Sequence, residues 1–173
     1  VEMMDAEALA PLDDLIDDIG RDKFAETALD EGEKDGECYS IPLYSHAMVM
    51  WYRKDLLQEA GLEVPKTWDE LAEAAKTLTK DGVYGCSFPC GSNDLMGTRF
   101  LNFYVRSGGG SLLTDDLKAD LTSDLAIDGI NYWLDIYKNC SPKDSLNYAV
   151  LDQATLFYQG KTAFDFNSGF QIG

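Results

Sequence analysis

The chain has 173 residues, and 45% of them are hydrophobic, which is enough to build the core of one ordinary domain. Its 31 acidic residues outnumber its 14 basic ones, giving a formal net charge of −17 at pH 7. This charge disfavours binding to the phosphate backbone of a nucleic acid. No window of about twenty apolar residues is present, so the sequence predicts no membrane-spanning helix.

The chain begins at Val1 with neither an initiator methionine nor a recognisable signal peptide, so we expect a fragment of a longer protein. Four scattered cysteines are present, at Cys38, Cys86, Cys90 and Cys140. Only Cys86 and Cys90 are close in sequence, and without a second close Cys or His pair they make a poor zinc site. We therefore expect neither a metal nor another cofactor. Their spacing does not define a disulfide, and packed thiols are the favoured interpretation.

The first third of the chain predicts one helix and one strand. Apolar residues near 12–19 have helical spacing, and the acidic stretch at 30–37 is typical of a polar turn. An extended segment is expected at 38–43 and a strand at about 47–52. A helix at 54–60 would then end at Gly61, a residue type favoured just after a helix.

The middle of the chain carries the clearest local signal. Thr67 and Glu70 have the T-x-x-E spacing of a capping box, which predicts a helix starting at Trp68. Small residues at 83–88 predict a strand. A loop at 91–98 then leads into a helix that runs to Ser107 and is broken by three glycines.

The last third predicts two helices and a short strand. One helix, at 124–139, carries Ile127, Ile130, Leu134 and Tyr137 on one face, and the other, at 149–158, carries Val150, Ala154 and Phe157. A strand at 162–166 precedes a polar turn at 167–170. Strands that alternate with helices indicate an α/β fold, with a sheet covered by helices.

Motifs of catalysis are scarce. The sequence contains no phosphate-binding glycine loop, no G-x-S-x-G motif and one histidine. Asp165 follows an apolar strand pattern between Phe164 and Phe166, and alternation predicts a solvated or capping carboxylate. An acidic carbohydrate-active enzyme that uses a pair of carboxylates stays open as the alternative function.

Four blocks occur in a specific order: "DGECYSIP", "MWYRKDLL" followed by "AGLEVPKTWDEL", "GGG" after a helix, and "FYQGKTAF" before a polar turn. With these blocks the chain resembles the extracytoplasmic solute-binding proteins of sugar ABC importers, the maltose-binding-protein-like group. The resemblance implies a binding protein rather than an enzyme, with a periplasmic-binding-protein-like fold. Two lobes would close on a sugar or oligosaccharide and present it to membrane permease subunits.

The resemblance also implies an incomplete receptor, lacking the first lobe and the C-terminal helices. Residues 1–37 would form a lead-in helix and turn near the crossing between lobes, and residues 38–173 the partial body of the second lobe. The protein would lie outside the cytoplasm, in the periplasm or as a lipoprotein on the cell surface. Apolar surface left by the missing segments would favour dimerisation of the fragment.

Matching the chain to the family's cleft-facing segments, the resemblance implies a set of ligand contacts. Aromatic rings would stack on a sugar, while amides, carboxylates and a guanidinium would bind its hydroxyl groups. The implied contacts are Tyr44, Ser45, His46, Ser92, Asn93, Asp94, Arg99, Asn167, Ser168 and Phe170. A sugar receptor is therefore the leading hypothesis, and a lobe for a non-sugar solute is a further alternative.

Overall fold

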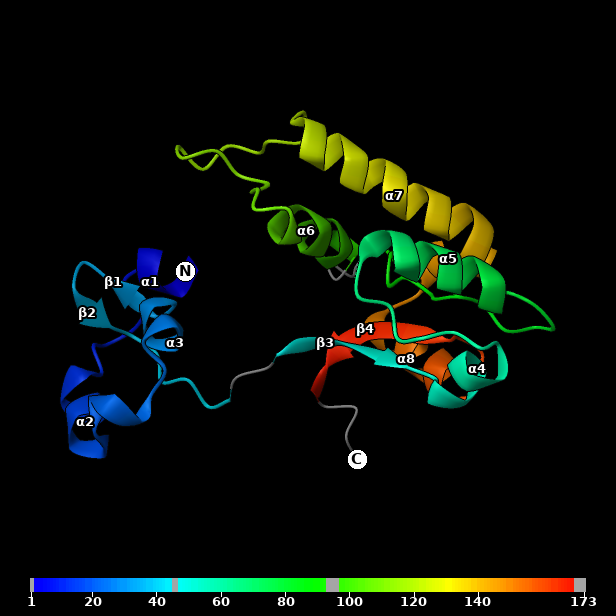
Figure 1. Ribbon diagram of the computed structural model, residues 1–173. Coiled ribbons are helices and arrows are strands. Elements are labelled where there is room, and N and C mark those ends of the chain that lie inside the picture. Colours follow the sequence, from blue (N-terminus) through cyan, green and yellow to red (C-terminus); the bar gives the residue numbers. More distant parts are fainter. Residues whose placement is uncertain (1, 45–46, 93–96, 170–173) are drawn as a thin grey trace. The chain divides into compact units, whose positions relative to one another are not determined.

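The computed structural model describes residues 2–44, 47–92 and 97–169 (Figure 1). The chain divides into two compact units, Val1–Ala47 and Met48–Gly173. Among the described residues, no helix is both long and apolar enough to cross a membrane. The predicted division at residues 37 and 38 concerns lobes of a larger receptor, and it stays a prediction.

The first unit consists of short elements: α1 Glu2–Asp5, α2 Asp13–Ile19, the 3₁₀ turn η1 Arg21–Lys23, α3 Glu26–Asp30, β1 Glu33–Lys34 and β2 Glu37–Cys38. The predicted helix near 12–19 is confirmed as α2. The predicted polar turn is the centre of a hairpin, because β1 and β2 pair antiparallel around Asp35 and Gly36. Both residues have positive φ, 55° and 85°, as a two-residue hairpin turn with a right-handed strand twist requires.

A small core holds the first unit together. Ile16, Leu29 and Cys38 are buried in it. The Asp13 carboxylate accepts hydrogen bonds from the backbone N–H of Cys38 at 3.0 Å and from the Arg21 guanidinium at 3.3 Å. One side chain therefore joins the start of α2 to the hairpin.

The second unit contains two strands and most of the helices: β3 Met48–Tyr52, α4 Lys54–Glu59, α5 Trp68–Leu78, α6 Thr98–Ser107, α7 Asp124–Cys140, the 3₁₀ turn η3 Lys143–Asn147, α8 Val150–Tyr158 and β4 Phe164–Ser168. The predicted helices are all present, with ends within one or two residues of the prediction. Gly61 has φ +67°, which confirms it as the residue that ends α4.

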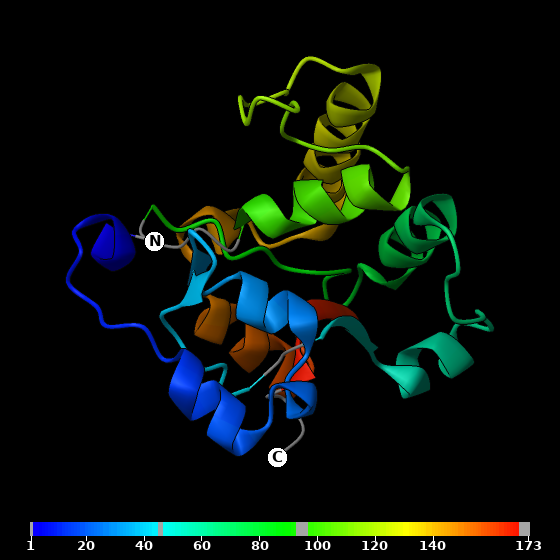
Figure 2. The same cartoon turned by 90° about the vertical axis from the view of Figure 1, so that its left-hand side faces the viewer.

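Strands β3 and β4 pair antiparallel, with Met48 opposite Ser168 and Tyr52 opposite Phe164. Helices α5, α6 and α7 lie on one side of this pair, and α8 lies next to β4 on the other (Figure 1). Figure 2 shows α6 and α7 from a second direction, with their connecting loop extending beyond the helix ends. The predicted α/β character is thus present as helices around a strand pair.

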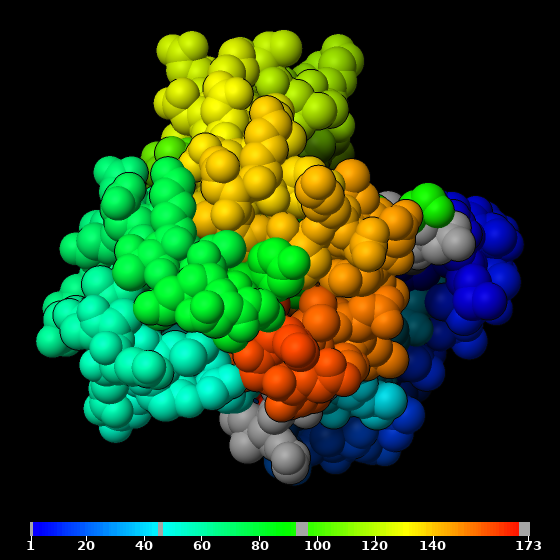
Figure 3. Space-filling model, turned by 90° about the vertical axis from the view of Figure 1, so that its right-hand side faces the viewer, coloured from blue at the N-terminus to red at the C-terminus, as the bar shows by residue number. Residues whose placement is uncertain are grey.

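The segment predicted as a strand at 83–88 forms isolated bridges instead of a full strand: an antiparallel one between Val83 and Lys80 and a parallel one between Tyr84 and Thr162. Figure 3 shows the green atoms of this segment beside orange atoms of the chain that leads into β4. The backbone N–H of Phe164 donates to the carbonyl of Gly85 at 2.8 Å. A Cβ at Gly85 would lie 2.7 Å from the Cβ of Ala75 in α5, so this close approach requires glycine.

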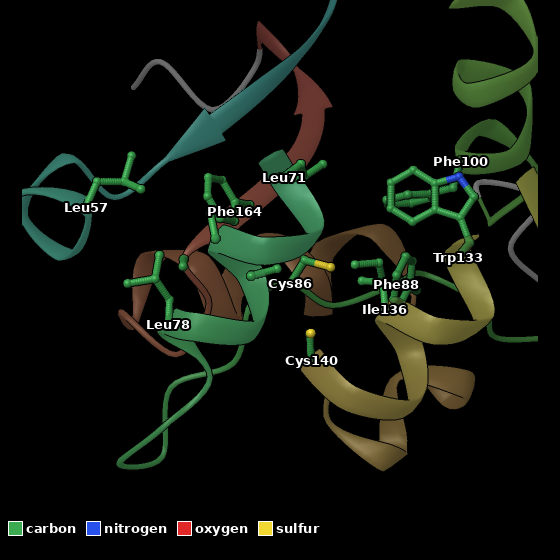
Figure 4. Packing of buried hydrophobic residues seen from close by; sticks show 13 residues of the cluster. Leu57, Leu71, Leu78, Cys86, Phe88, Phe100, Trp133, Ile136, Cys140 and Phe164 are labelled. Carbon is green, nitrogen blue, oxygen red and sulfur yellow. The ribbon is translucent and has the colours of Figure 1, made fainter. Parts of the chain in front are cut away.

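Aromatic rings fill the core of the second unit (Figure 4). The Trp133 ring lies edge-on to Phe100 and Phe88, with centroid separations of 5.1 and 5.7 Å. Trp68 packs against Trp133 at 5.5 Å in the same geometry. Edge-to-face contacts of this kind add to the stabilisation from burial.

The apolar face of α7 that the sequence predicts is not its most buried face, and one carboxylate is more buried than expected. Helix α7 buries Trp133, Ile136 and Cys140, whereas Ile127 and Leu134 of the predicted face are both 45% exposed. Asp165, predicted to be a solvated or capping carboxylate, is only 1% exposed, so the solvated alternative is wrong. The physical reason is that both faces of β4 are covered, so alternation along the strand does not bring the carboxylate to solvent.

Candidate functional site

Two of the predicted contacts, Arg99 and Asn167, lie together at one end of the β3–β4 pair. Arg99 is in the first turn of α6, and Asn167 is in the last part of β4. Both line a cavity of about 10 Å³, whose walls also include Met48 and Gln153. The structure therefore joins two residues that are far apart in the sequence.

Asn167 is 1% exposed, and its carboxamide is held at one end. Its Oδ1 accepts a hydrogen bond from the backbone N–H of Ser168 at 2.9 Å. Its Nδ2 has no hydrogen-bond partner among the described residues. Ser168 is also buried, so the polar side chains at the end of β4 are packed inside the second unit.

Arg99 is half-buried, and its Nη1 contacts the Met48 sulfur at 3.3 Å. Met48 is opposite Ser168 in the strand register, so this contact holds α6 against the start of β3. Within the described ranges, Arg99 forms no ion pair with a carboxylate. A guanidinium without an acidic partner retains donors for the oxygen atoms of a solute.

The remaining predicted contacts are less informative. Tyr44 is 75% exposed in the first unit, and Ser92 is exposed in the second. Five others lie outside the described residues: Ser45, His46, Asn93, Asp94 and Phe170. Contact of all these residues with a ligand stays a prediction.

Sequence reasoning missed Gln153 of α8. This side chain is 1% exposed, lines the same cavity, and has no hydrogen-bond partner for Oε1 or Nε2 among the described residues. A signal was available, because Val150, Ala154 and Phe157 occupy the i, i+4 and i+7 positions of an apolar stripe. Gln153 is the i+3 member, and a glutamine at a core-facing position indicates a buried polar site.

A larger open hollow of about 440 Å³ lies at the start of α5, where Met50, Lys66, Trp68 and Ser107 form part of its lining. Trp68 Nε1 donates to Ser107 Oγ at 2.7 Å, and that hydroxyl donates to the Tyr104 carbonyl at 2.8 Å. The Trp68 and Ser107 side chains are thus engaged in the fold, and no predicted contact lines this hollow. We therefore place the candidate site at the end of β4 and not in this larger hollow.

An apolar groove of about 340 Å³ runs along α6 and α7 and is lined by Phe88, Cys90, Gly97, Phe100, Leu101, Ile130, Trp133, Leu134, Tyr137 and Leu146. Of the two exposed residues of α7 named above, Leu134 lines this groove. Such a surface favours association with apolar side chains and offers few groups to a polar solute.

The buried thiols do not resemble nucleophiles. Burial raises the pKa of the Cys86 thiol far above its usual range, and the Ser141 hydroxyl next to it offsets only part of this shift. A protonated thiol is a poor nucleophile. In the described part of the chain, no three His, Cys, Asp or Glu side chains are grouped to hold a metal ion.

Comparison with known proteins identifies relatives along the whole chain. The family described as "Bacterial extracellular solute-binding protein" matches residues 1–173. A binding protein from Brucella abortus (strain 2308) is 30% identical over 155 residues, which cover 87% of this chain and 37% of the relative. An arabinooligosaccharide-binding protein from Halalkalibacterium halodurans is 38% identical over 74 residues, or 42% of this chain and 16% of that protein.

Solved structures agree on the fold. An ABC transporter solute-binding protein from Agrobacterium radiobacter K84, crystallised with ribitol, superposes with a TM-score of 0.85 at 25% identity. The match covers 96% of this chain and 43% of the other. The chain thus has the fold of one part of such a protein, and it spans less than half of the length of these relatives.

Proposed function

Because the chain belongs to the bacterial extracellular solute-binding protein family, we propose that it is part of a receptor that binds a neutral sugar or polyol for an ABC importer. The family predicted from the ordered sequence blocks is thereby confirmed. Membership also makes the chain part of a binding protein and not of an enzyme.

One observation carries the choice of ligand class: Arg99 and Asn167 converge at the end of the β3–β4 pair. A guanidinium and a carboxamide offer planar donors and acceptors that match the hydroxyl groups of a sugar or polyol. The names of two relatives add support, since one binds an arabinooligosaccharide and the other was crystallised with ribitol.

In this proposal the solute contacts the residues predicted from the sequence. Arg99, Asn167 and Ser168 bind hydroxyl groups, and Tyr44 and Phe170 stack on apolar C–H faces. The loop segments before β3 and before α6 supply the remaining polar contacts, from Ser45, His46, Ser92, Asn93 and Asp94.

Residues 38–173 would form the partial body of a second lobe, and residues 1–37 would lead into it. The rest of the receptor would supply the first lobe, which closes over the solute and creates the surface that permease subunits recognise. The receptor would act outside the cytoplasm, either in the periplasm or held on the cell surface by a lipid anchor.

Calorimetry on the full-length receptor tests the proposal. The panel contains arabinose and its oligosaccharides, ribitol, mannitol, maltose, glycerol 3-phosphate and a short peptide. We expect saturable binding of at least one neutral sugar or polyol. Tight binding of the peptide or of the phosphate ester, together with no response to any neutral member, would overturn the ligand class.

The isolated chain offers a second measurement. It carries only part of the proposed site, so its sugar affinity should be far below that of the full-length receptor. Equal affinities would contradict the proposal that another lobe completes the site. Dimerisation of the isolated chain through apolar surface left by the missing segments also stays a prediction, which sedimentation can check.

A further inference from the structure

The buried amide of Gln153 is the starting point. Helix α8 places this side chain on its core-facing stripe, where it is 1% exposed. Neither Oε1 nor Nε2 has a hydrogen-bond partner among the described residues. A primary amide carries one acceptor and two donors, and burying all of them unpaired strongly opposes folding.

Asn167 also has a buried group without a hydrogen-bond partner among the described residues. Its Oδ1 is occupied by the Ser168 N–H, while its Nδ2 has no partner within the described ranges. Helix α8 lies next to β4, and the two amides line one cavity. Two buried amides that line one small space could share one hydrogen-bond partner, and buried polar groups in native proteins are almost always hydrogen-bonded.

The cavity has the size and the chemistry for that explanation. Its volume is about 10 Å³, close to the minimum that holds one water molecule. A water in this place could donate to Gln153 Oε1 and accept from Asn167 Nδ2, which would give each amide one hydrogen bond that it lacks among the described residues. The Arg99 guanidinium, which lines the same space, is a third donor within the wall.

We propose that one buried water bridges Gln153 and Asn167, and that Gln153 is a positioning residue for the sugar site. The water accepts a hydrogen bond from Asn167 Nδ2, while the Ser168 N–H donates to Asn167 Oδ1. Together the two bonds fix the orientation of the carboxamide. Gln153 does not touch the solute. The role assigned to it in solute binding rests on the proposed function, whereas the water site stands on the cavity and the two amides alone.

A crystal structure of the full-length receptor, at a resolution that shows ordered water, tests the first part. We expect one water peak within hydrogen-bond distance of both amides. A direct Gln153–Asn167 hydrogen bond, or a cavity closed by side chains, would overturn the proposal. This result can be read even if no sugar binds, so it distinguishes failure of the water site from failure of the proposed function.

Sugar affinity tests the second part through a double-mutant cycle. Gln153→Met keeps the length of the side chain but removes its hydrogen bonds, and it should weaken binding of the best sugar by roughly tenfold. On the Asn167→Ala background the same change should have almost no further effect, because the group that it positions is gone. Leu151→Ala, an exposed change on the same helix, is the matched control and should bind as wild type.

Additive effects of the two substitutions, or wild-type affinity of Gln153→Met, would show that Gln153 has only a packing role. If Gln153→Met does not fold, the electron density of the wild-type receptor decides. A bridging water in that density supports the proposal, and its absence refutes it.

Discussion

Thr67 and Glu70 cap α5 reciprocally. The backbone N–H of Glu70 donates to Thr67 Oγ1 at 3.2 Å, and Glu70 Oε2 accepts from the backbone N–H of Thr67 at 3.2 Å. The same carboxylate oxygen accepts from the Lys66 N–H at 2.7 Å. The bonds of Thr67 and Glu70 satisfy donors that every helix start leaves without an intrahelical partner, and the Lys66 N–H, just before the N-cap, is satisfied by the same carboxylate.

Removal of this cap should destabilise the second unit. Thr67→Ala is expected to lower the free energy of unfolding by about 1 kcal/mol, as for other N-cap residues. Thr77→Ala is a matched control in the same helix, because among the described residues the Thr77 hydroxyl donates only to the Glu73 carbonyl. Urea denaturation of both variants checks this, and equal losses would contradict a specific capping role.

The orientation of α7 predicts unequal costs for two neighbouring apolar residues. Ile136 is buried in the aromatic core, and Ile136→Ala should cost about 2–5 kcal/mol through lost contacts and a residual cavity. Leu134 is 45% exposed, so Leu134→Ala should cost about 1 kcal/mol or less. Thermal denaturation measures both losses of stability. A larger loss for Leu134→Ala than for Ile136→Ala would contradict the orientation of α7 described above.

Arg53 predicts a pH effect through Asp55. The Arg53 Nε donates to Asp55 Oδ1 at 2.8 Å, and this hydrogen bond lowers the pKa of Asp55 from 3.8 to about 2. A carboxyl with a lower pKa in the folded protein stabilises it only while ionised. The contribution is therefore present above pH ~4 and is lost as the pH falls towards ~2.

Asp55→Asn removes this titration. The difference in unfolding free energy between wild type and variant should shrink between pH ~4 and pH ~2. Denaturant titrations over that range measure it. A difference that stays constant with pH would exclude the ion pair as its source.

The cysteines should differ in reactivity. Cys90 is exposed, whereas Cys38, Cys86 and Cys140 are buried, and burial raises the pKa of Cys86 and of Cys140. Brief treatment with iodoacetamide at neutral pH should alkylate Cys90 alone, and all four thiols should react in denaturant. Peptide mass spectrometry checks this, and early labelling of Cys86 would contradict its burial.

Arg99 should matter to solute binding in a way that Arg106 does not. Both are in α6, but Arg99 lines the cavity at the end of β4 and Arg106 is exposed near the helix C-terminus. In the full-length receptor, Arg99→Ala should weaken sugar binding by roughly ten- to a hundredfold, and Arg106→Ala should leave it unchanged. Calorimetry with the best ligand gives both affinities, and equal effects would argue against a specific contact.

Local signals predicted the helices well. The T-x-x-E spacing locates the start of α5, and Gly61 marks the end of α4, because caps and left-handed glycines act within a few residues. Burial was harder to predict. Helix α7 is apolar on more than one side, and the choice between Leu134 and Ile136 depends on the neighbouring helices rather than on the periodicity.

The candidate site shows the same division. Arg99 and Asn167 were predicted from the resemblance, but no pattern in the sequence predicts that they share a cavity. Gln153 was missed because a glutamine in a short helix is usually exposed, and only the packing of α8 beside β4 makes it a core residue. The burial of Asp165 likewise depends on tertiary coverage of a strand that looks two-sided in sequence.

Gly85 couples the candidate site at the end of β4 to α5, a helix that does not line the cavity there. Gly85 lies against Ala75 of α5 without room for a methyl group, and its carbonyl accepts the N–H of Phe164 at the start of β4. Any larger side chain at this position would separate α5 from the extended segment. The Gly85 carbonyl would then shift, and its hydrogen bond from Phe164 would move β4, the strand that carries Asn167. Selection for solute affinity would therefore also act on the interface between α5 and this segment, among residues that no solute contacts.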